Sequence, residues 1–375
     1  MAGASWYGDK DKGEICLPFI QDPGLVDEAK KAGWLTRLYR RRGLSGPVAA
    51  VLLLGFLLTP LLPGKFPTIV ATEILIVGLF ALSFNLIYGY MGQISFGHGA
   101  FFGLGAYATA LLLRYFQMSA GEVSYFGFFL AILAALPVSA FGSLIVGFFC
   151  IRLTGIYFAM LSLAFGELLF YIVFSWYSFT KGDDGIQGLM PPPFFQNSTH
   201  YYYFTLAIVV MAALLLWRIT ESPFGYTLRM LRDNRNRAAF LGINARRVML
   251  MNFVTAGIFA GLAGALWGPF QRSVSPALLG WAESGKAVFM TLIGGAYFLV
   301  GPMAGSIIYT GLNAYVTRYT VFWPLTIGLI ILLIVLFVPG GLLSVIDQRI
   351  SRRGTERESR ERIPPEAAPG PENEA

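Results

Sequence analysis

Long apolar stretches recur along this chain, and they constrain its fold more than any other feature. A helix needs about 20 mainly apolar residues to cross a membrane, because each unpaired backbone group costs several kcal/mol in lipid. The stretches that meet this description are 44–62, 66–88, 95–114, 125–150, 154–177, 202–219, 249–270, 284–300, 302–318 and 322–338. The eighth and ninth are short and are joined by Gly301-Pro302, so the expected number of spans is about ten, within a range of eight to ten. The sequence therefore predicts an all-α, polytopic membrane protein.

Composition excludes an ordinary soluble domain. Hydrophobic residues make up 55% of the 375 residues and charged residues only 13%, whereas charged residues average about 25% in soluble proteins. The two cysteines offer neither a disulfide framework nor metal-ligand spacing. No metal site is expected.

The positions of the basic residues predict the orientation of the chain. Basic clusters precede the first apolar stretch at Arg40 to Arg42 and recur in residues 221–247 and 347–375, while single basic residues lie on the opposite side. Cytoplasmic segments carry the excess of lysine and arginine, so both termini are expected in the cytoplasm. We interpret the net charge of +7 as a sign of this topology and of contact with the lipid bilayer, and expect no nucleic-acid partner.

Three segments follow from this organisation. Residues 1–43 form a basic cytoplasmic N-terminal segment without a cleavable signal peptide, and residues 44–345 form the transmembrane domain with the cytoplasmic segment 221–247 inside it. Residues 346–375 are charged and proline-rich, so we expect a disordered cytoplasmic tail.

The stretch "GQISFGHGAFFGLGAYATALL" combines glycines with polar side chains inside an apolar region. Small residues let helices pack closely in lipid, and glycine also permits a broken helix whose backbone groups can bind a solute. Both interpretations stay open. We expect His98 to form an interhelical hydrogen bond in preference to acting as a titrating switch. The candidate residues for a solute pathway are Gly92, Gln93, Ser95, Gly97, His98, Gly99 and Gly103.

Residues 221–247 are strongly basic and stand between two spans. Ser222-Pro223 is a plausible helix start, Gly242 with Asn244 is a plausible stop, and the apolar positions between them predict an amphipathic helix. Such a helix can rest its arginines on anionic lipid, or it can dock on a separate ATP-hydrolysing subunit. From these residues alone the lipid interpretation is favoured.

The chain shows no catalytic constellation, so we expect a transporter component and not an enzyme. "GWAESGKA" nearly fits a phosphate loop, but Ala287 replaces the hydroxyl that would hold Mg²⁺, and Glu283 and Lys286 are expected to pair at a helix start. The energy for transport must therefore come from ATP hydrolysed by another subunit or from an ion gradient. An ion-coupled secondary carrier would use intramembrane acids such as Glu73 and Glu167.

Several ordered motifs resemble one family. The pattern from Gly89 to Tyr107, the segments "RLTGIYFAMLSLAFGELLF" and "KGDDGIQG", and the later "GYTLRMLRDNRNRAAFLGIN", "AGLAGAL" and "VPGGLL" look like the LivM-type permeases of branched-chain amino acid ABC importers. The resemblance covers roughly residues 44–345. It implies a multi-pass permease of the bacterial inner membrane that translocates branched-chain or other small amino acids. Urea, short amides or aromatic acids are the alternative solutes.

The resemblance also implies partners. These are a second homologous permease, two ATP-binding subunits that hold ATP and Mg²⁺, and a periplasmic solute-binding protein facing the loop 178–200, although that loop could equally be a solvated connector. This chain is expected to bind no cofactor itself. Residues 221–247 become a coupling loop, although the glutamate common in such loops is missing from Arg235 to Ala239. The coupling residues expected are Phe224, Gly225, Arg229, Arg232, Asp233, Arg235, Arg237, Gly242 and Asn244.

Overall fold

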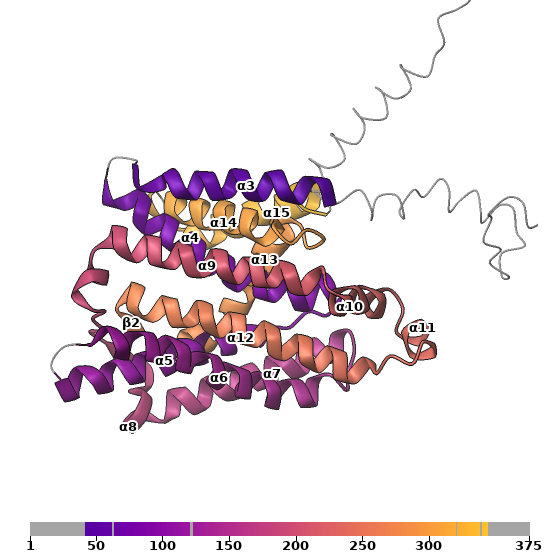
Figure 1. Ribbon diagram of the computed structural model, residues 1–375, viewed down its shortest axis with the longest axis horizontal. Coiled ribbons are helices and arrows are strands. Elements are labelled where there is room, and N and C mark those ends of the chain that lie inside the picture. Colours follow the sequence, from indigo (N-terminus) through magenta and orange to yellow (C-terminus); the bar gives the residue numbers. More distant parts are fainter. Residues whose placement is uncertain (1–41, 62–63, 121–122, 320, 338–339, 344–375) are drawn as a thin grey trace, which may run out of the picture.

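The computed structural model describes residues 42–61, 64–120, 123–319, 321–337 and 340–343. The N-terminal segment 1–43, apart from its last two residues, and the tail 346–375 lie outside the described residues. Long helices dominate the described chain and run side by side in Figure 1. They are α3 (Arg42–Leu58), α4 (Lys65–Asn85), α5 (His98–Ala120), α6 (Tyr125–Cys150), α7 (Ile156–Ser175), α9 (Ser198–Thr220), α12 (Ala245–Gln271), α13 (Trp281–Gly294), α14 (Gly301–Tyr319) and α15 (Trp323–Phe337).

Each predicted apolar stretch overlaps one of these helices. Among the described residues, six helical segments are long and apolar enough to cross a membrane, namely Lys65–Tyr90, His98–Ser119, Tyr125–Cys150, Ile156–Ser175, Ser198–Thr220 and Ala245–Gln271. The prediction of an all-α, polytopic membrane protein is confirmed.

Glycine and serine bring α12 into close contact with its neighbours. A Cβ on Gly261 would overlap the Ser139 hydroxyl of α6, and a Cβ on Gly264 would overlap the Phe102 carbonyl oxygen of α5. Gly105 of α5 likewise faces the backbone of Gly261. Small residues allow this approach where no hydrophobic force drives helices together in lipid. The glycines of α12 therefore serve close helix packing.

The chain leaves the helical path between α4 and α5. Helix α4 continues into the π-helical turn η2 (Leu86–Tyr90), and α5 begins only at His98, three residues after the start expected from the apolar pattern. Gly92 lies between them with a φ of 72°, a conformation that favours glycine. We call the non-helical residues 91–97 the α4–α5 break.

Helix α13 differs from the span expected at 284–300, because it starts earlier and is shorter. It begins at Trp281 and ends at Gly294, because Gly295 takes a φ of 107° and the chain turns back toward α14. A Cβ on Gly305 would overlap the Met290 carbonyl oxygen, so glycines hold this turn closed. Fourteen residues give a helix of about 21 Å, shorter than the roughly 30 Å of a bilayer core.

Connecting elements gather at the two ends of the helix bundle. One end carries α8 (Tyr177–Thr180), η3 (Gly182–Asp184), η4 (Pro193–Gln196) and an antiparallel pair of strands, β1 (Ile186–Gln187) and β2 (Ser273–Val274). From β2 the chain enters the bundle through η5 (Pro276–Leu279), which packs against Gly103 of α5. The opposite end carries α10 (Pro223–Asp233) and α11 (Arg235–Phe240), as Figure 1 shows. We call residues 221–244, which contain both helices, the hairpin.

Candidate functional site

Three helices meet beside the α4–α5 break. The His98 Nε2 atom lies 2.9 Å from the Ser83 Oγ atom of α4, and the fully buried imidazole stacks on Phe80. The Gly99 amide donates to Ser284 Oγ of α13 at 2.7 Å. The expected interhelical hydrogen bond of His98 is confirmed, and the N-terminal ends of α5 and α13 lie against each other.

The glycines of this region serve close packing. A Cβ on Gly97 would overlap the Ser162 carbonyl oxygen of α7, and a Cβ on Gly103 would overlap the Leu279 side chain. Gly99 faces the carbonyl oxygen of Gly280. Packing, one of the two interpretations left open by the sequence, accounts for these three glycines.

The other candidate pathway residues differ in their surroundings. Gln93 accepts a hydrogen bond from the Gly155 amide at 2.9 Å, which ties the break to the start of α7. The Ser95 hydroxyl is buried and has no partner among the described residues. Gly92 is exposed next to Arg232. The pathway role of the seven residues stays a prediction.

Charged side chains line a small cavity between α4, α13 and α14. Glu73, Glu283, Lys286, Tyr309 and Asn313 all border this cavity of about 40 Å³. The remaining lining residues are Val77, Phe80, Phe102, Trp267 and Thr310. Val77 is near the middle of the Lys65–Tyr90 segment, so the cavity lies deep in the bundle. We call the first five residues the cavity cluster.

The cavity cluster is unusual for this depth. Charged residues near the centre of a membrane helix cost about 2.5–3.5 kcal/mol each and almost always face a bundle interior or a water-filled path. Lys286 Nζ pairs with Glu283 Oε1 at 2.5 Å, as the sequence predicted. Within the part of the chain that is described, Glu73 has no hydrogen bond or ion pair in this structure.

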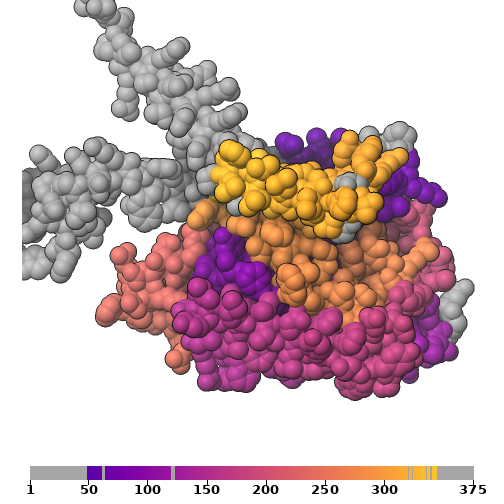
Figure 2. Space-filling model, turned by 180° about the vertical axis from the view of Figure 1, so that it is seen from behind, coloured from indigo at the N-terminus to yellow at the C-terminus, as the bar shows by residue number. Residues whose placement is uncertain are grey.

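The face around Lys286 is open on this chain. The Lys286 side chain is 41% exposed, and that of Glu283 is 18% exposed. In Figure 2 orange residues of α13 and α14 are visible between the yellow α15 and the magenta α7. A lysine at this depth does not face hydrocarbon, so this face borders water or another protein surface.

Glu167 has a different role from Glu73. Its Oε1 atom accepts a hydrogen bond from the Trp281 amide at 3.1 Å, and so it caps the first turn of α13 from the neighbouring α7. An acid at a helix N-terminus compensates unpaired amides there. The two acids that an ion-coupled carrier would use therefore lie in different surroundings.

Helix α10 directs two of its arginines into the membrane domain. Arg232 Nη1 donates a hydrogen bond to the Gly89 carbonyl oxygen, and its guanidinium lies 4.8 Å from the ring centre of Tyr297. Arg229 pairs with Glu221 at 3.3 Å and lies 5.1 Å from the ring centre of Tyr90. Both arginines were expected to serve coupling to an ATPase, and the structure places their side chains against this chain's own helices.

The remaining coupling residues are distributed over the hairpin. Gly225 is buried against Thr220, and Phe224 is half-buried in the core. The exposed residues are Asp233, Arg237, Gly242 and Asn244. Arg235 is half-buried, one of its nitrogens has no partner among the described residues, and desolvation lowers its pKa.

The hairpin corrects the single helix expected over this segment. Asn234 is extended between α10 and α11, and its side chain accepts a hydrogen bond from the Arg237 amide at 3.0 Å. Asparagine competes with the helix by capping locally, and this breaks the helix in two. Asn244 caps α12 in the same way through the Arg247 amide at 3.2 Å.

Two apolar side chains at the tip of the hairpin were missed. Phe240 is 92% exposed and Leu241 is 67% exposed, beside the basic residues of α11. Leu241 is one of the apolar positions from which an amphipathic helix was expected, but unlike Leu228 and Leu231 it is not buried. An exposed phenylalanine flanked by arginines is a signal that could have indicated a protein contact.

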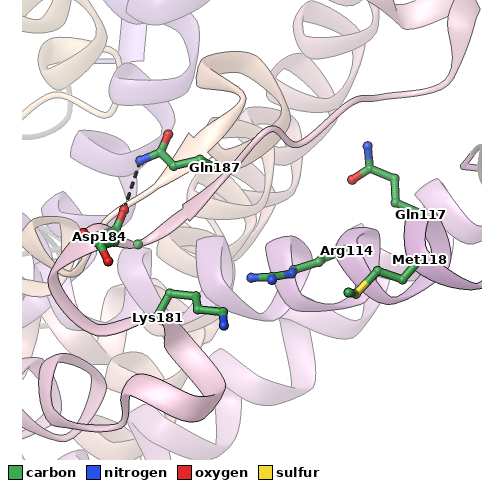
Figure 3. A pocket seen from close by; sticks show the side chains of 7 residues that line it. Arg114, Gln117, Met118, Lys181, Asp184 and Gln187 are labelled. Atoms are coloured by element: carbon green, nitrogen blue, oxygen red, sulfur yellow. Dashed lines mark hydrogen bonds between the residues drawn. The ribbon is translucent and has the colours of Figure 1, made fainter.

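A polar groove of about 550 Å³ lies at the opposite end of the bundle (Figure 3). Arg114, Gln117 and Met118 at the end of α5 face Lys181, Asp184 and Gln187 of the connecting loop across it. Gln187 donates to the Asp184 carbonyl oxygen at 3.1 Å. No ion pair of Arg114 or Lys181 with a carboxylate occurs within the described residues.

No group of three or more histidine, cysteine, aspartate or glutamate side chains in the described residues is arranged to hold a metal ion.

Comparison with known proteins places these features in context. Residues 66–339 match the family described as branched-chain amino acid transport system, permease component. The high-affinity branched-chain amino acid transport system permease protein LivM of Escherichia coli is 25% identical over 301 residues, which cover 73% of this chain and 69% of the relative. LivH of Salmonella typhimurium, a permease protein described in the same words, is 27% identical over 285 residues, or 71% of this chain and 90% of the relative.

A permease of another import system matches a shorter part of the chain. The autoinducer 2 import system permease protein LsrC of Photorhabdus laumondii is 24% identical over 147 residues, or 37% of this chain and 44% of the relative. No solved structure matches the chain significantly.

Proposed function

This chain belongs to the family of branched-chain amino acid transport system permease components, and from that premise we propose that it carries small amino acids through the membrane as part of an ATP-binding-cassette importer. Family membership confirms the resemblance found in the sequence motifs. It makes the chain a transporter permease and not a member of an enzyme family. The solute is proposed from the printed names of the relatives LivM and LivH.

The importer has four kinds of subunit in this proposal. The chain pairs with a second homologous permease, two ATP-binding subunits hold ATP and Mg²⁺, and a periplasmic binding protein delivers the solute. The chain itself binds no cofactor. The open face around Lys286 and the exposed tip of the hairpin support the need for partners, because neither is suited to lipid or water alone.

The proposed topology has eight to ten crossings of the bacterial inner membrane. Both termini and the α10–α11 hairpin are cytoplasmic, and the polar groove is periplasmic. The placement of the hairpin and the groove at opposite ends of the bundle supports this orientation, as does the excess of arginine in the hairpin. The binding protein then docks on the side of the groove.

The contact between Arg232 and the α4–α5 break is the observation that carries the proposal. An ATP-binding subunit that closes on ATP would push the tip of the hairpin at Phe240 and Leu241. Arg232 would pass this movement to the Gly89 backbone, and Arg229 would pass it to the ring of Tyr90. A shift in the relative stability of two conformations would follow, switching the pathway between outward and inward access.

The predicted pathway residues take part through the break in this scheme. The irregular backbone of residues 91–97 is the segment that can move without breaking a regular helix. Gln93 connects it to α7, and Gly99, in the first turn of α5 directly after the break, connects α5 to α13. Movement at the break would therefore reach two further helices.

The proposal is tested by affinity purification of the tagged chain from its native membrane in mild detergent, followed by reconstitution into liposomes. We expect stoichiometric recovery of ATP-binding subunits and a second permease, and uptake of radiolabelled amino acids that needs ATP and the binding protein. Recovery of the chain alone, with uptake that survives ATP depletion, would contradict the importer and favour an ion-coupled carrier.

A further inference from the structure

We infer that the cavity cluster is the point at which the permease holds the two charged ends of a zwitterionic α-amino acid during its passage. The inference rests on the importer proposed above and adds the residues that recognise the charged groups of its solute.

The depth of the cavity suits such a role. Its lining comes from α4, α5, α12, α13 and α14, and Val77 lies near the centre of the Lys65–Tyr90 segment. Solute sites of membrane transporters are typically near the midplane, where discontinuous helices meet. Helix α13 is such a short helix, and Glu283 and Lys286 lie in its first two turns.

The charges of the cluster match a zwitterion. Lys286 has three donors, of which one pairs with Glu283, so it can also bind a solute carboxylate. Glu73 has no ion pair in the described structure and can bind a solute ammonium group. Tyr309 and Asn313 add uncharged hydrogen-bonding groups to the same wall. Each charge of the solute thereby has a partner of opposite sign.

The alternative solutes suit this cluster less well. Urea and short amides carry no charge, so they give no reason to retain two acids and a lysine at a depth where charges are costly. Aromatic acids would need the lysine and would be repelled by Glu73. The composition of the cluster therefore favours an α-amino acid.

The cavity is narrow in this structure. Its volume of about 40 Å³ holds only a few water molecules. An amino acid is larger than this volume, so the cavity must widen to hold one, although Lys286 on its wall is already 41% exposed.

Both ends of α13 are connected to the coupling route. Near its start, Ser284 accepts the hydrogen bond of Gly99, and Ser284 lies directly after Glu283 in the chain. Beyond its end, Tyr297 lies under the guanidinium of Arg232. A movement of α10 would therefore shift α13 and open or close the cavity cluster.

The test uses the whole importer, purified with its partners and reconstituted into liposomes. The probe is a radiolabelled mixture of α-amino acids, added outside the liposomes together with the binding protein, while ATP and Mg²⁺ are enclosed in the lumen. We measure uptake per ATP hydrolysed for Glu73→Gln and Lys286→Gln. The matched control is Glu167→Gln, which removes an intramembrane acid outside the cavity but retains an oxygen to accept the Trp281 hydrogen bond.

We expect uptake per ATP to fall about tenfold in both cavity variants, because each loses a hydrogen bond to a charged group. ATP hydrolysis stimulated by the binding protein should stay near the wild-type rate, and Glu167→Gln should behave as wild type. Unchanged uptake per ATP in both cavity variants would overturn the inference and leave the importer intact. A wild-type complex without ATP-dependent uptake would instead overturn the proposed function.

Assembly is checked by size-exclusion chromatography. If Glu73→Gln does not assemble, Glu73→Asp and Tyr309→Phe replace it, since the first keeps the charge and the second removes only a hydroxyl. We then expect Glu73→Asp to retain uptake and Tyr309→Phe to lower uptake per ATP. Normal uptake per ATP by both Tyr309→Phe and Lys286→Gln would contradict solute binding by the cavity cluster.

The solute class is tested with radiolabelled urea and benzoate in the same liposomes. We expect neither to be taken up by the wild-type importer. ATP-dependent uptake of urea or benzoate without uptake of any amino acid would overturn the assignment of a zwitterion while supporting the importer.

Discussion

The Arg232 guanidinium of α10 donates a hydrogen bond to the backbone carbonyl of Gly89, at the end of the helix that continues α4. The carbon chain of the same arginine lies beside Gly92, where a Cβ would overlap it. The hairpin is therefore in direct contact with the backbone of the α4–α5 break, and a side chain at Gly92 would separate them.

The first prediction concerns this contact. Arg232→Ala should lower ATP-dependent uptake about tenfold, because a hydrogen bond to a charged donor contributes about 1.5–3 kcal/mol. The ATP-binding subunits should still copurify, since the side chain is only 26% exposed and faces the membrane domain. Uptake and copurification are measured on the same reconstituted sample.

Arg246→Ala is the control, because Arg246 is an exposed arginine in the first turn of α12, next to the hairpin. Loss of the ATP-binding subunits in Arg232→Ala alone would show that Arg232 is a docking residue, as the sequence analysis expected, and would contradict its role inside the chain.

The tip of the hairpin gives a second prediction. Phe240→Asp should weaken binding of the ATP-binding subunits, because an apolar anchor at an interface contributes about 2 kcal/mol or more. Folding should be unaffected because this side chain is 92% exposed. Copurified ATP-binding subunit is quantified by mass spectrometry.

Met118→Asp serves as the matched control at the other end of the bundle, where the side chain is 77% exposed. Equal recovery of ATP-binding subunits from Phe240→Asp and Met118→Asp would remove the support for docking at the tip.

Local signals in the sequence predicted much of the fold. Apolar stretches located the helices, and Ser222-Pro223 located the start of α10. These features depend on neighbouring residues, and a single sequence contains them. The break at Asn234 was missed because a capping side chain and a continuing helix compete, and their balance depends on the surroundings.

The cavity cluster could not be predicted in the same way. Glu73 and Lys286 are far apart in the chain and meet only because α13 is short and packs against α4. The direction of Arg232 was equally hidden, since an arginine on an amphipathic helix reads as a surface residue. The sequence indicated which residues carry charge, and the tertiary fold decides what each charge faces.

Helix packing supplies a third prediction. Gly264→Ala should destabilise the protein by about 1–3 kcal/mol, because its Cβ would overlap the Phe102 carbonyl oxygen and α5 would have to move. Gly311→Ala is matched to it, since Gly311 also lies in a helix but has open space around a Cβ. We expect a lower midpoint of thermal unfolding for Gly264→Ala only, followed by fluorescence-detected chromatography. A midpoint for Gly264→Ala at or above that of Gly311→Ala would argue against this close contact.

The polar groove gives the last prediction, which concerns the binding protein. Arg114 and Lys181 face the groove from two different segments and have no carboxylate partner among the described residues. Exposed charges at an interface mainly steer association and act more strongly at low salt. Arg114→Glu should therefore slow the association of the solute-loaded binding protein with the reconstituted importer, and the difference from wild type should shrink as salt is added. Surface plasmon resonance on nanodiscs measures both rates, with Arg318→Glu as the control for a basic residue outside the groove. Equal slowing by the two variants would indicate a general effect of net charge, and the groove would then have no specific part in docking.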